Sequence, residues 1–575
     1  GISTTHANDN QFYGPLSSTA SAAGMNNMPS AKRTKTHKES YRLANTLTYR
    51  NSFNKSHNVN IMLGQEINHA QNDNTFMSAK LFPVSVTAEA ALENFALGTP
   101  NQSTSYRSAP DRTSSFFGRA LYDYKNRYYA TLTVRADGST KFAPGKQWGY
   151  FPAGSIAWRI SNEKWMKPIR FISDLKLRAS YGLAGNNRIG NDLWHNIYRV
   201  YSGTSAPAFG NEEYNYYQFA DQTYLYDPDL KWETTITRNI GLDFGFFRNR
   251  LSGTVDVYWN TTKDLLVPSI IPNSSGYSRQ MTNVGQTSNK GVEISLDAKI
   301  VQTKNFQLSA NFNVAFNKNK VDKLATGETE WKTKASLSNW YGTYNYKMEV
   351  GKSMGLIYGF VNDGFYKVDD FDFDATTKKW TLKPGVPDNS SFSSGNFAFK
   401  PGAMKFKKLS DSESNLITED DMTVIGDTNP KVTGGFGLSG NWKNLDFTAF
   451  FNYMCDFDVL NVNKLYLHSA VRRNYSNLST DMNLANRFRY VDDAGVNVSS
   501  DPVALAALNE NAKTYSWMSV TQGITMTDLV EDGSFLRLST LTVGYTLPKH
   551  WLQSLGVKSL RLYFSGSNLF TITGY

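Results

Sequence analysis

Residues 306–317 read Phe-Gln-Leu-Ser-Ala-Asn-Phe-Asn-Val-Ala-Phe-Asn, and this stretch decides the fold. Counting from Phe306, every second side chain is apolar, and the side chains between them are polar apart from Ala315. A β-strand sends successive side chains to opposite faces, so one face of this strand suits lipid and the other suits water. Strands of about ten residues with this alternation are typical of a transmembrane β-barrel.

The same alternation recurs in pairs of strands that are joined by very short turns. Within residues 290–300, Val292 and Ile294 face one way and Glu293 faces the other. A one-residue slip would place acidic side chains in lipid, so the register is strongly specified. Fourteen strands are predicted in this way, at residues 41–53, 57–68, 113–124, 127–137, 149–160, 174–184, 231–246, 251–262, 290–300, 306–317, 432–441, 445–455, 532–547 and 558–571.

Long connections separate these hairpins, near residues 69–112, 185–230, 263–289, 318–431 and 456–531. Connections of this length are uncommon in compact soluble domains and are usually functional. In outer-membrane barrels the long loops are extracellular and the short turns are periplasmic. The segment 318–431 contains further β-like runs at 356–365 and 397–406, which fit either an extra barrel hairpin or a folded extracellular loop.

Composition agrees with strands rather than helices as the membrane-spanning elements. No stretch approaches the ~18 uninterrupted apolar residues that mark a membrane-spanning helix. Aromatic residues make up 14% of the chain, which would supply the girdles at the two bilayer interfaces. The net charge of +10 is scattered rather than gathered in a stripe, which argues against a nucleic-acid partner. The single cysteine, Cys455, excludes an internal disulfide framework.

No catalytic motif stands out, so the sequence predicts that the protein is not an enzyme. The chain has 7 histidines and contains neither a His-Glu-x-x-His pattern nor a Gly-x-Ser-x-Gly elbow. The glycines of residues 434–437 lie in a predicted strand rather than before a helix, which argues against a phosphate-binding loop. A soluble β-sandwich or propeller remains an alternative fold, but its strands average five or six residues, about half the length predicted here.

Longer motifs carry a family resemblance. Asn289-Lys-Gly-Val-Glu-Ile294 and Gly533-Ser-Phe-Leu-Arg-Leu-Ser-Thr-Leu-Thr-Val-Gly-Tyr-Thr-Leu-Pro548, with residues 228–251, 262–266, 283–286 and 560–570, resemble a SusC/RagA-type TonB-dependent outer-membrane transporter. The resemblance implies a 22-stranded antiparallel barrel with an N-terminal plug, in the outer membrane of a Gram-negative cell. Residues 1–575 would then be an all-β barrel domain of about 14–16 strands, without the plug, the first strands and the last strand.

The resemblance also implies a function. The family imports oligosaccharides or oligopeptides actively, with a SusD-like surface lipoprotein over the long loops and with TonB acting through the plug. The barrel itself would contact outer-membrane lipid. Two alternatives remain from other functional classes. One is a passive surface-binding or structural barrel, and the other is a soluble all-β carbohydrate-binding protein. Neither the substrate nor the oligomeric state follows from the sequence.

Two aromatic clusters in the long connections are candidates for substrate contact. An aromatic ring can stack on a sugar or cover a protein interface, although packing within the loop would use the same residues. The candidates are Tyr214, Tyr216, Tyr217, Trp340, Tyr341, Tyr344 and Tyr346.

The segment 411–421 is acidic and resembles a calcium loop found in relatives. Asp411, Glu413 and Asn415 would be the oxygen ligands, since alternate positions bind Ca²⁺ in loops of this kind. Leu416 stands near the position where such a loop needs glycine for its sharp turn. We therefore expect a solvated acidic loop rather than a Ca²⁺ site, and no cofactor.

Overall fold

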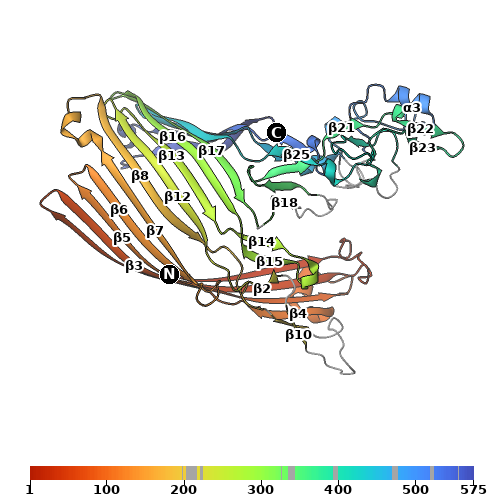
Figure 1. The fold of residues 1–575 in the computed structure, drawn as a ribbon, viewed down its shortest axis with the longest axis horizontal. Coiled ribbons are helices and arrows are strands. Elements are labelled where there is room, and N and C mark those ends of the chain that lie inside the picture. Colours follow the sequence, from red (N-terminus) through yellow and green to blue (C-terminus); the bar gives the residue numbers. More distant parts are fainter. Residues whose placement is uncertain are drawn as a thin grey trace. The chain divides into compact units, whose positions relative to one another are not determined.

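The computed structural model describes residues 1–196, 198–201, 217–220, 224–325, 327–333, 344–392, 399–468, 477–517, 524–553 and 556–575, without the side chains of 198–201, 217–220 and 465–466. A sixteen-stranded sheet is its main element (Figure 1). In spatial order the strands are β1 (Ile2–Tyr13), β2 (Ser30–Phe53), β3 (His57–Lys80), β5 (Asp111–Tyr124), β6 (Tyr128–Ser139), β7 (Trp148–Arg159), β8 (Ile172–Asn186), β12 (Glu233–Phe246), β13 (Leu251–Lys263), β16 (Gln286–Gln302), β17 (Phe306–Lys323), β26 (Val432–Trp442), β27 (Leu445–Cys455), β30 (Phe535–Thr546) and β31 (Arg561–Thr573), with β4 (Thr99–Arg107) paired to β3.

All fourteen predicted strands are present, and β1 and β4 are additional. The sequence pattern missed β1 because its side chains are polar on both faces from Ser3 to Gln11, apart from Ala7, and give no alternation. β4, which runs from Thr99 to Arg107, is likewise mostly polar. Apart from β4, the strands follow one another in the sheet in the order of the sequence, as expected for a sheet built from successive hairpins.

Strand register places large apolar side chains in continuous rows across one face. On β17, β26 and β27 the row runs through Phe312, Phe436 and Phe451, and the rings of the last two stack with centroids 4.8 Å apart. In the isolated chain this face is open, so that Leu47 is 72% exposed and Ile156 is 66% exposed. Apolar side chains in unbroken rows of this kind need lipid rather than water around them.

Two rows of aromatic side chains bound the apolar band of the first strands. Near the turns, the row passes through Tyr124, Tyr128 and Trp158, with centroids 6.4 and 6.5 Å apart. Near the long connections, Tyr41 stacks on His69 with centroids 4.8 Å apart. The rows lie about twelve residues apart along β2, which corresponds to about 30 Å of bilayer for a strand tilted by about 40°.

β2 and β3 are 24 residues long and continue past the Tyr41 row. Their outer halves pair with β1 and β4, so the first part of the segment 69–112 is strand rather than loop. Helix α1 (Ala88–Glu93) covers a small core at this end. The core consists of Ala31, Ala79, Phe82 and Ala91, with Phe12, Val86, Leu92 and Phe95 packed against it.

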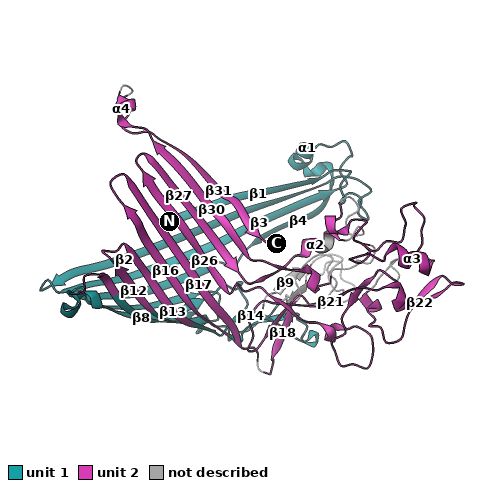
Figure 2. Ribbon diagram, turned by 90° about the horizontal axis from the view of Figure 1, so that it is seen from above, with its two compact units in different colours: residues 1–168, 176–240, 260–286 teal, residues 169–175, 241–259, 287–575 magenta. Residues whose placement is uncertain are grey.

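The chain divides into two compact units, coloured in Figure 2. The first comprises residues 1–168, 176–240 and 260–286, and the second comprises residues 169–175, 241–259 and 287–575. The first unit also holds two small sheets formed by long connections. Their strands are β9 (Tyr198–Tyr201) with β10 (Tyr217–Ala220), and β11 (Tyr224–Leu225) with β15 (Arg279–Asn283) and β14 (Leu266–Ile270).

In the second unit the two longest connections fold together into what we call the loop module, the described residues of 324–431 and 456–534. Its strands are β18 (Glu330–Thr333), β19 (Tyr346–Glu349), β20 (Leu356–Gly359), β21 (Asn362–Phe365), β22 (Phe371–Asp374), β23 (Lys379–Leu382), β24 (Met404–Phe406), β25 (Thr423–Asp427), β28 (Asp458–Leu460) and β29 (Val530–Asp532), and its helices are α2 (Val462–Leu467) and α3 (Pro502–Leu508). They form small sheets of two to four strands. The β-like runs of 318–431 therefore belong to a folded loop and not to the main sheet.

The loop module has its own hydrophobic core. Its fully buried side chains come from both connections, and Phe360 of the first forms a β-bridge with Met526 of the second. The core residues are Tyr358, Phe360, Met404, Phe406, Ile417, Met422, Met482, Tyr515, Ile524, Met526 and Leu529. A further short helix, α4 (Lys549–Leu552), follows β30. None of the helices in the described ranges has the length and apolar character needed to cross a membrane.

The buried carboxylate of Asp421 ties the loop module together locally. It accepts hydrogen bonds from the backbone N–H groups of Leu409, Ser410 and Thr418 at 2.8–2.9 Å, and from the Lys408 ammonium at 3.1 Å. Burial alone would raise the pKa of Asp421, but these donors together hold it well below its usual range. The stabilisation is therefore present above about pH 4 and is lost as the pH falls through the lowered pKa.

The assignment of the two sheet faces can be tested at the middle of residues 306–317. Phe312→Lys is expected to destabilise the protein in lipid by about 2–4 kcal/mol, because a charge on the lipid face loses its hydration. Asn313→Lys is the matched control, because its side chain lies on the polar face and tolerates a charge. Guanidinium unfolding in lipid vesicles measures both, and equal destabilisation by the two variants would contradict the assignment.

Asp421→Asn is expected to open the surrounding segment of the loop module, because an amide oxygen cannot accept all these donors. Breaking a buried charged pair costs about 3 kcal/mol. Hydrogen exchange of peptides covering residues 405–424 measures the effect, and faster exchange is expected at neutral pH. Asp420→Asn is the control, since Asp420 is exposed. The proposed role of Asp421 is wrong if the two variants exchange alike.

Candidate functional site

The polar face of the first unit carries a charge network across three strands. On β2, Arg42 donates to Glu66 Oε2 on β3 at 2.8 Å. Asn68 donates to Glu66 Oε1 at 2.9 Å and to Thr113 Oγ1 on β5 at 3.1 Å. The antiparallel register sets Arg42 directly opposite Asn68, so the network follows from strand pairing. The network gives this face hydrogen-bonding groups in fixed positions, and the negative charge of Glu66 in it is paired with Arg42.

A second paired charge lies further along the same face. Arg135 Nε contacts both carboxylate oxygens of Asp137 at 2.8 Å, two residues along β6. Its guanidinium also lies 5.4 Å from the ring centroid of Phe117 on β5, which is a cation–π arrangement. Arg135 and Asp137 are two residues apart on one strand, so their side chains project from the same face, which is the polar face of the sheet.

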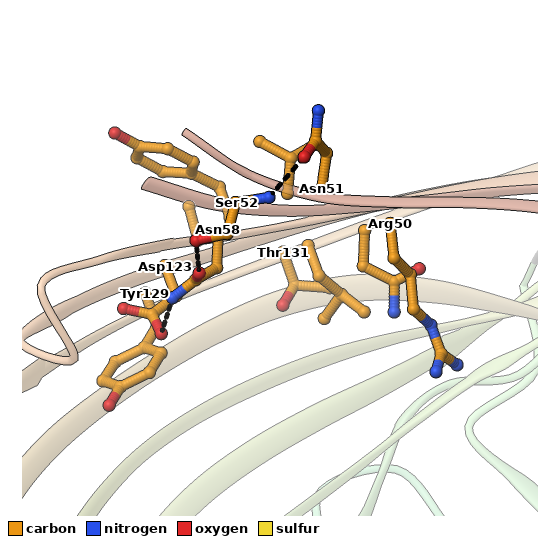
Figure 3. Close-up of a pocket in the computed structure, with 12 residues that line it drawn as sticks. Arg50, Asn51, Ser52, Asn58, Asp123, Tyr129 and Thr131 are labelled. Atoms are coloured by element: carbon orange, nitrogen blue, oxygen red, sulfur yellow. Dashed lines mark hydrogen bonds between the residues drawn. The ribbon is translucent and has the colours of Figure 1, made fainter. Parts of the chain in front are cut away.

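Near the turns, the polar face is hollowed (Figure 3). Ser52 Oγ on β2 donates to Asn58 Oδ1 on β3 at 2.7 Å, and Asn58 Nδ2 donates to Asp123 Oδ2 on β5 at 3.2 Å. Arg50 and Tyr129 line the same hollow. This arrangement offers both donors and acceptors to a polar ligand or to a polypeptide segment that lies against the sheet.

The structure describes only part of the predicted aromatic clusters. Tyr214, Tyr216, Trp340 and Tyr341 lie outside the described residues. Tyr217 begins β10, opposite Tyr201 of β9, and its side chain is not described.

The two remaining aromatic candidates lie in the loop module. Tyr344 packs half-buried against the core of the module. Tyr346 belongs to β19, opposite Thr333 and Ile357. The position of Tyr344 fits the loop-packing alternative, and substrate contact by either residue stays a prediction.

All three predicted calcium ligands of the acidic segment lie within the described residues. Asp411 and Glu413 are exposed, and Asn415 offers its backbone carbonyl to the Asp388 N–H at 2.8 Å. At the end of this segment, the Lys408 ammonium lies 3.1 Å from the buried Asp421 carboxylate. Within the described ranges, no three or more His, Cys, Asp or Glu side chains are grouped to hold a metal. The expectation of a solvated acidic loop without Ca²⁺ stays a prediction.

A buried polar group in the loop module had no signal in the sequence. His468 follows α2, and its Nδ1 lies 3.0 Å from the Tyr515 hydroxyl. Its Nε2 lies 2.7 Å from Asp481 Oδ2, a contact without hydrogen-bond geometry. Burial lowers the pKa of His468, and the Asp481 carboxylate opposes this effect. The three residues come from separate segments, so no local motif could have predicted their meeting.

Comparison with known proteins agrees with this architecture. A family model described as TonB dependent receptor-like, beta-barrel matches residues 2–382. TonB-dependent receptor P3 of Formosa agariphila is 32% identical over 531 residues, which cover 92% of this chain and 48% of the relative. TonB-dependent receptor SusC of Bacteroides thetaiotaomicron is 29% identical over 472 residues, which cover 80% of this chain and 40% of the relative. The chain thus spans about half the length of the curated relatives it matches, or less.

Among solved structures, the RagAB peptide transporter superposes with a TM-score of 0.74 at 24% sequence identity. The match covers 100% of this chain and 56% of the other chain, and at this identity it bears on the fold alone. The sheet order, the apolar face and the matched family model agree on one assignment. The chain belongs to the TonB-dependent receptor-like β-barrel family, as a SusC/RagA-type barrel of the outer membrane.

Proposed function

We propose that the protein is an active outer-membrane importer of oligosaccharides or oligopeptides, and that this chain forms the wall of its barrel. The observation that carries the proposal is the two-sided sheet. One face is apolar between two aromatic rows about 30 Å apart, and the other carries fixed polar groups. The outer-membrane location excludes the soluble carbohydrate-binding alternative.

The polar face suits the passage of a hydrophilic solute. Glu66 and Asp137 are each paired with an arginine on the same face. Such a wall can form hydrogen bonds with a passing solute. Because its carboxylates are already paired with arginines, they do not bind the solute tightly. A passage needs binding that is favourable enough for entry and weak enough for release. The proposal therefore assigns transport to this face, and no catalysis.

A SusD-like lipoprotein is the proposed partner at the outer end. The loop module gives it a folded surface, since the module has its own core rather than loose loops. Val503, Val496 and Leu484 are 81%, 56% and 58% exposed on this module. Apolar side chains at a protein surface favour contact with a partner when they gather into a patch. TonB is the second proposed partner, as in the names of the relatives, acting through the plug.

The substrate of the proposed importer can be an oligosaccharide or an oligopeptide. RagAB is a peptide transporter, whereas the names of the curated relatives state that they are receptors and give no substrate. Aromatic stacking and hydrogen bonding serve both solute classes. Both classes should therefore be offered in the same experiment.

Uptake should depend on TonB. Cells that produce the protein with its partner are given fluorescent oligosaccharide and oligopeptide mixtures, and cell-associated label is measured after washing. We expect accumulation of one class, and its loss when the tonB gene is deleted or a protonophore collapses the proton gradient. Cells without the protein are the control. Uptake that persists without TonB would favour the passive barrel, and binding without accumulation would favour a surface-binding role.

A further inference from the structure

Two histidines meet on the part of the sheet that extends beyond the bilayer. His6 of β1 is directly opposite His37 of β2, and His37 is directly opposite Asp73 of β3. Directly opposed residues of antiparallel strands project from the same face. The row lies beyond the aromatic pair Tyr41 and His69, in the direction of the long connections. Its side chains therefore face water rather than lipid.

The geometry of the two imidazoles matches a metal chelate. Their Nδ1 atoms are 3.1 Å apart, and the ring centroids are 4.4 Å apart with 33° between the planes. Imidazole binds Zn²⁺ at about 2.0–2.1 Å, so a metal bound to both nitrogens would have an N–metal–N angle of about 100°. This angle lies between those of square-planar and tetrahedral coordination, about 90° and about 109°.

We propose that His6 and His37 form a surface site for a divalent transition metal of the Zn²⁺ or Cu²⁺ class. Imidazole nitrogens suit these metals, and water completes the coordination because both rings are accessible. Within the residues described, no set of three or more ligating side chains gathers here, so the site is a two-imidazole chelate. Each ring binds the metal through Nδ1 and keeps its proton on Nε2.

The surroundings of the pair set its strength. Asp73 stands in the same row, and its carboxylate is held by Arg107 Nε at 3.1 Å. Arg107 also contacts Glu39 at 3.5 Å, so two carboxylates share one guanidinium beside the site. Asp73 can accept a hydrogen bond from a metal-bound water, as second-shell carboxylates do. Lys35 lies two residues along β2 from His37. Its positive charge repels a divalent cation, so the affinity of the site for metal is moderate.

A hydrogen bond between the two rings is the alternative use of this geometry. One neutral ring would then donate its Nδ1 proton to the other. Such a bond between exposed groups contributes little, because water competes for both nitrogens. A metal replaces that single bond with two coordinate bonds, and the two arrangements give different results with added metal.

Metal titration of the detergent-solubilised protein, purified without a histidine tag, tests the proposal. Isothermal titration with Zn²⁺ is expected to show one more saturable site in the unmodified protein than in the His6→Asn/His37→Asn double variant. His550→Asn is the matched control, since His550 is also exposed and lies far along the sequence. It should bind the same number of Zn²⁺ ions as the unmodified protein.

Electron paramagnetic resonance with Cu²⁺ gives a second readout that does not depend on affinity. Two equatorial nitrogens are expected at the site in the unmodified protein, and one in His6→Asn alone. Among the strands that the structure describes, β1 has β2 as its single neighbour in the sheet. The heat-modified gel mobility of each variant therefore serves to show whether the sheet is retained. Unchanged Zn²⁺ stoichiometry in the double variant, or a single nitrogen in the unmodified protein, would overturn the proposal.

Discussion

The structure depends on the requirement that every backbone N–H and C=O group inside a bilayer be paired within the protein. Strand pairing meets it, and the register of that pairing then decides which side chains meet. Phe312, Phe436 and Phe451 form one row on the lipid face because their strands pair in that register. The same rule aligns Arg42 with Asn68 on the polar face. A one-residue slip would exchange the two faces, so register and function are inseparable.

Outside the bilayer this requirement relaxes, because water satisfies free backbone groups. Outside the bilayer the chain forms short sheets, and the loop module has a hydrophobic core like that of a soluble domain. The loop module joins two connections that are far apart in sequence, through the bridge between Phe360 and Met526. The buried carboxylate of Asp421 is satisfied internally, by backbone N–H donors of the module itself. The Lys408 ammonium supplies a positive charge beside this carboxylate.

Strand prediction succeeded where the environment differs between the two faces. All strands that cross between the aromatic rows show alternation, since lipid and water select opposite side chains. β1 and β4 went unpredicted because both of their faces meet water. Of the two runs predicted within 318–431, residues 356–365 form β20 and β21, whereas only residues 404–406 of 397–406 are strand, and 397–398 lie outside the described residues. Periodicity could not assign these strands to their sheets. Of the candidate site residues, Tyr344 packs half-buried against the module core, and its contact with substrate stays a prediction.

The sequence by itself determined the fold class, the strand order and the family, because these rest on local alternation and on motifs within single hairpins. Only the tertiary structure decided which distant residues meet. His468 with Tyr515, and His6 with His37, come together through pairing and packing between segments that carry no mutual signal. The physical reason is that alternation within a strand depends only on the environment of that strand's two faces. The contacts of a site depend on how several strands and segments pair and pack with one another.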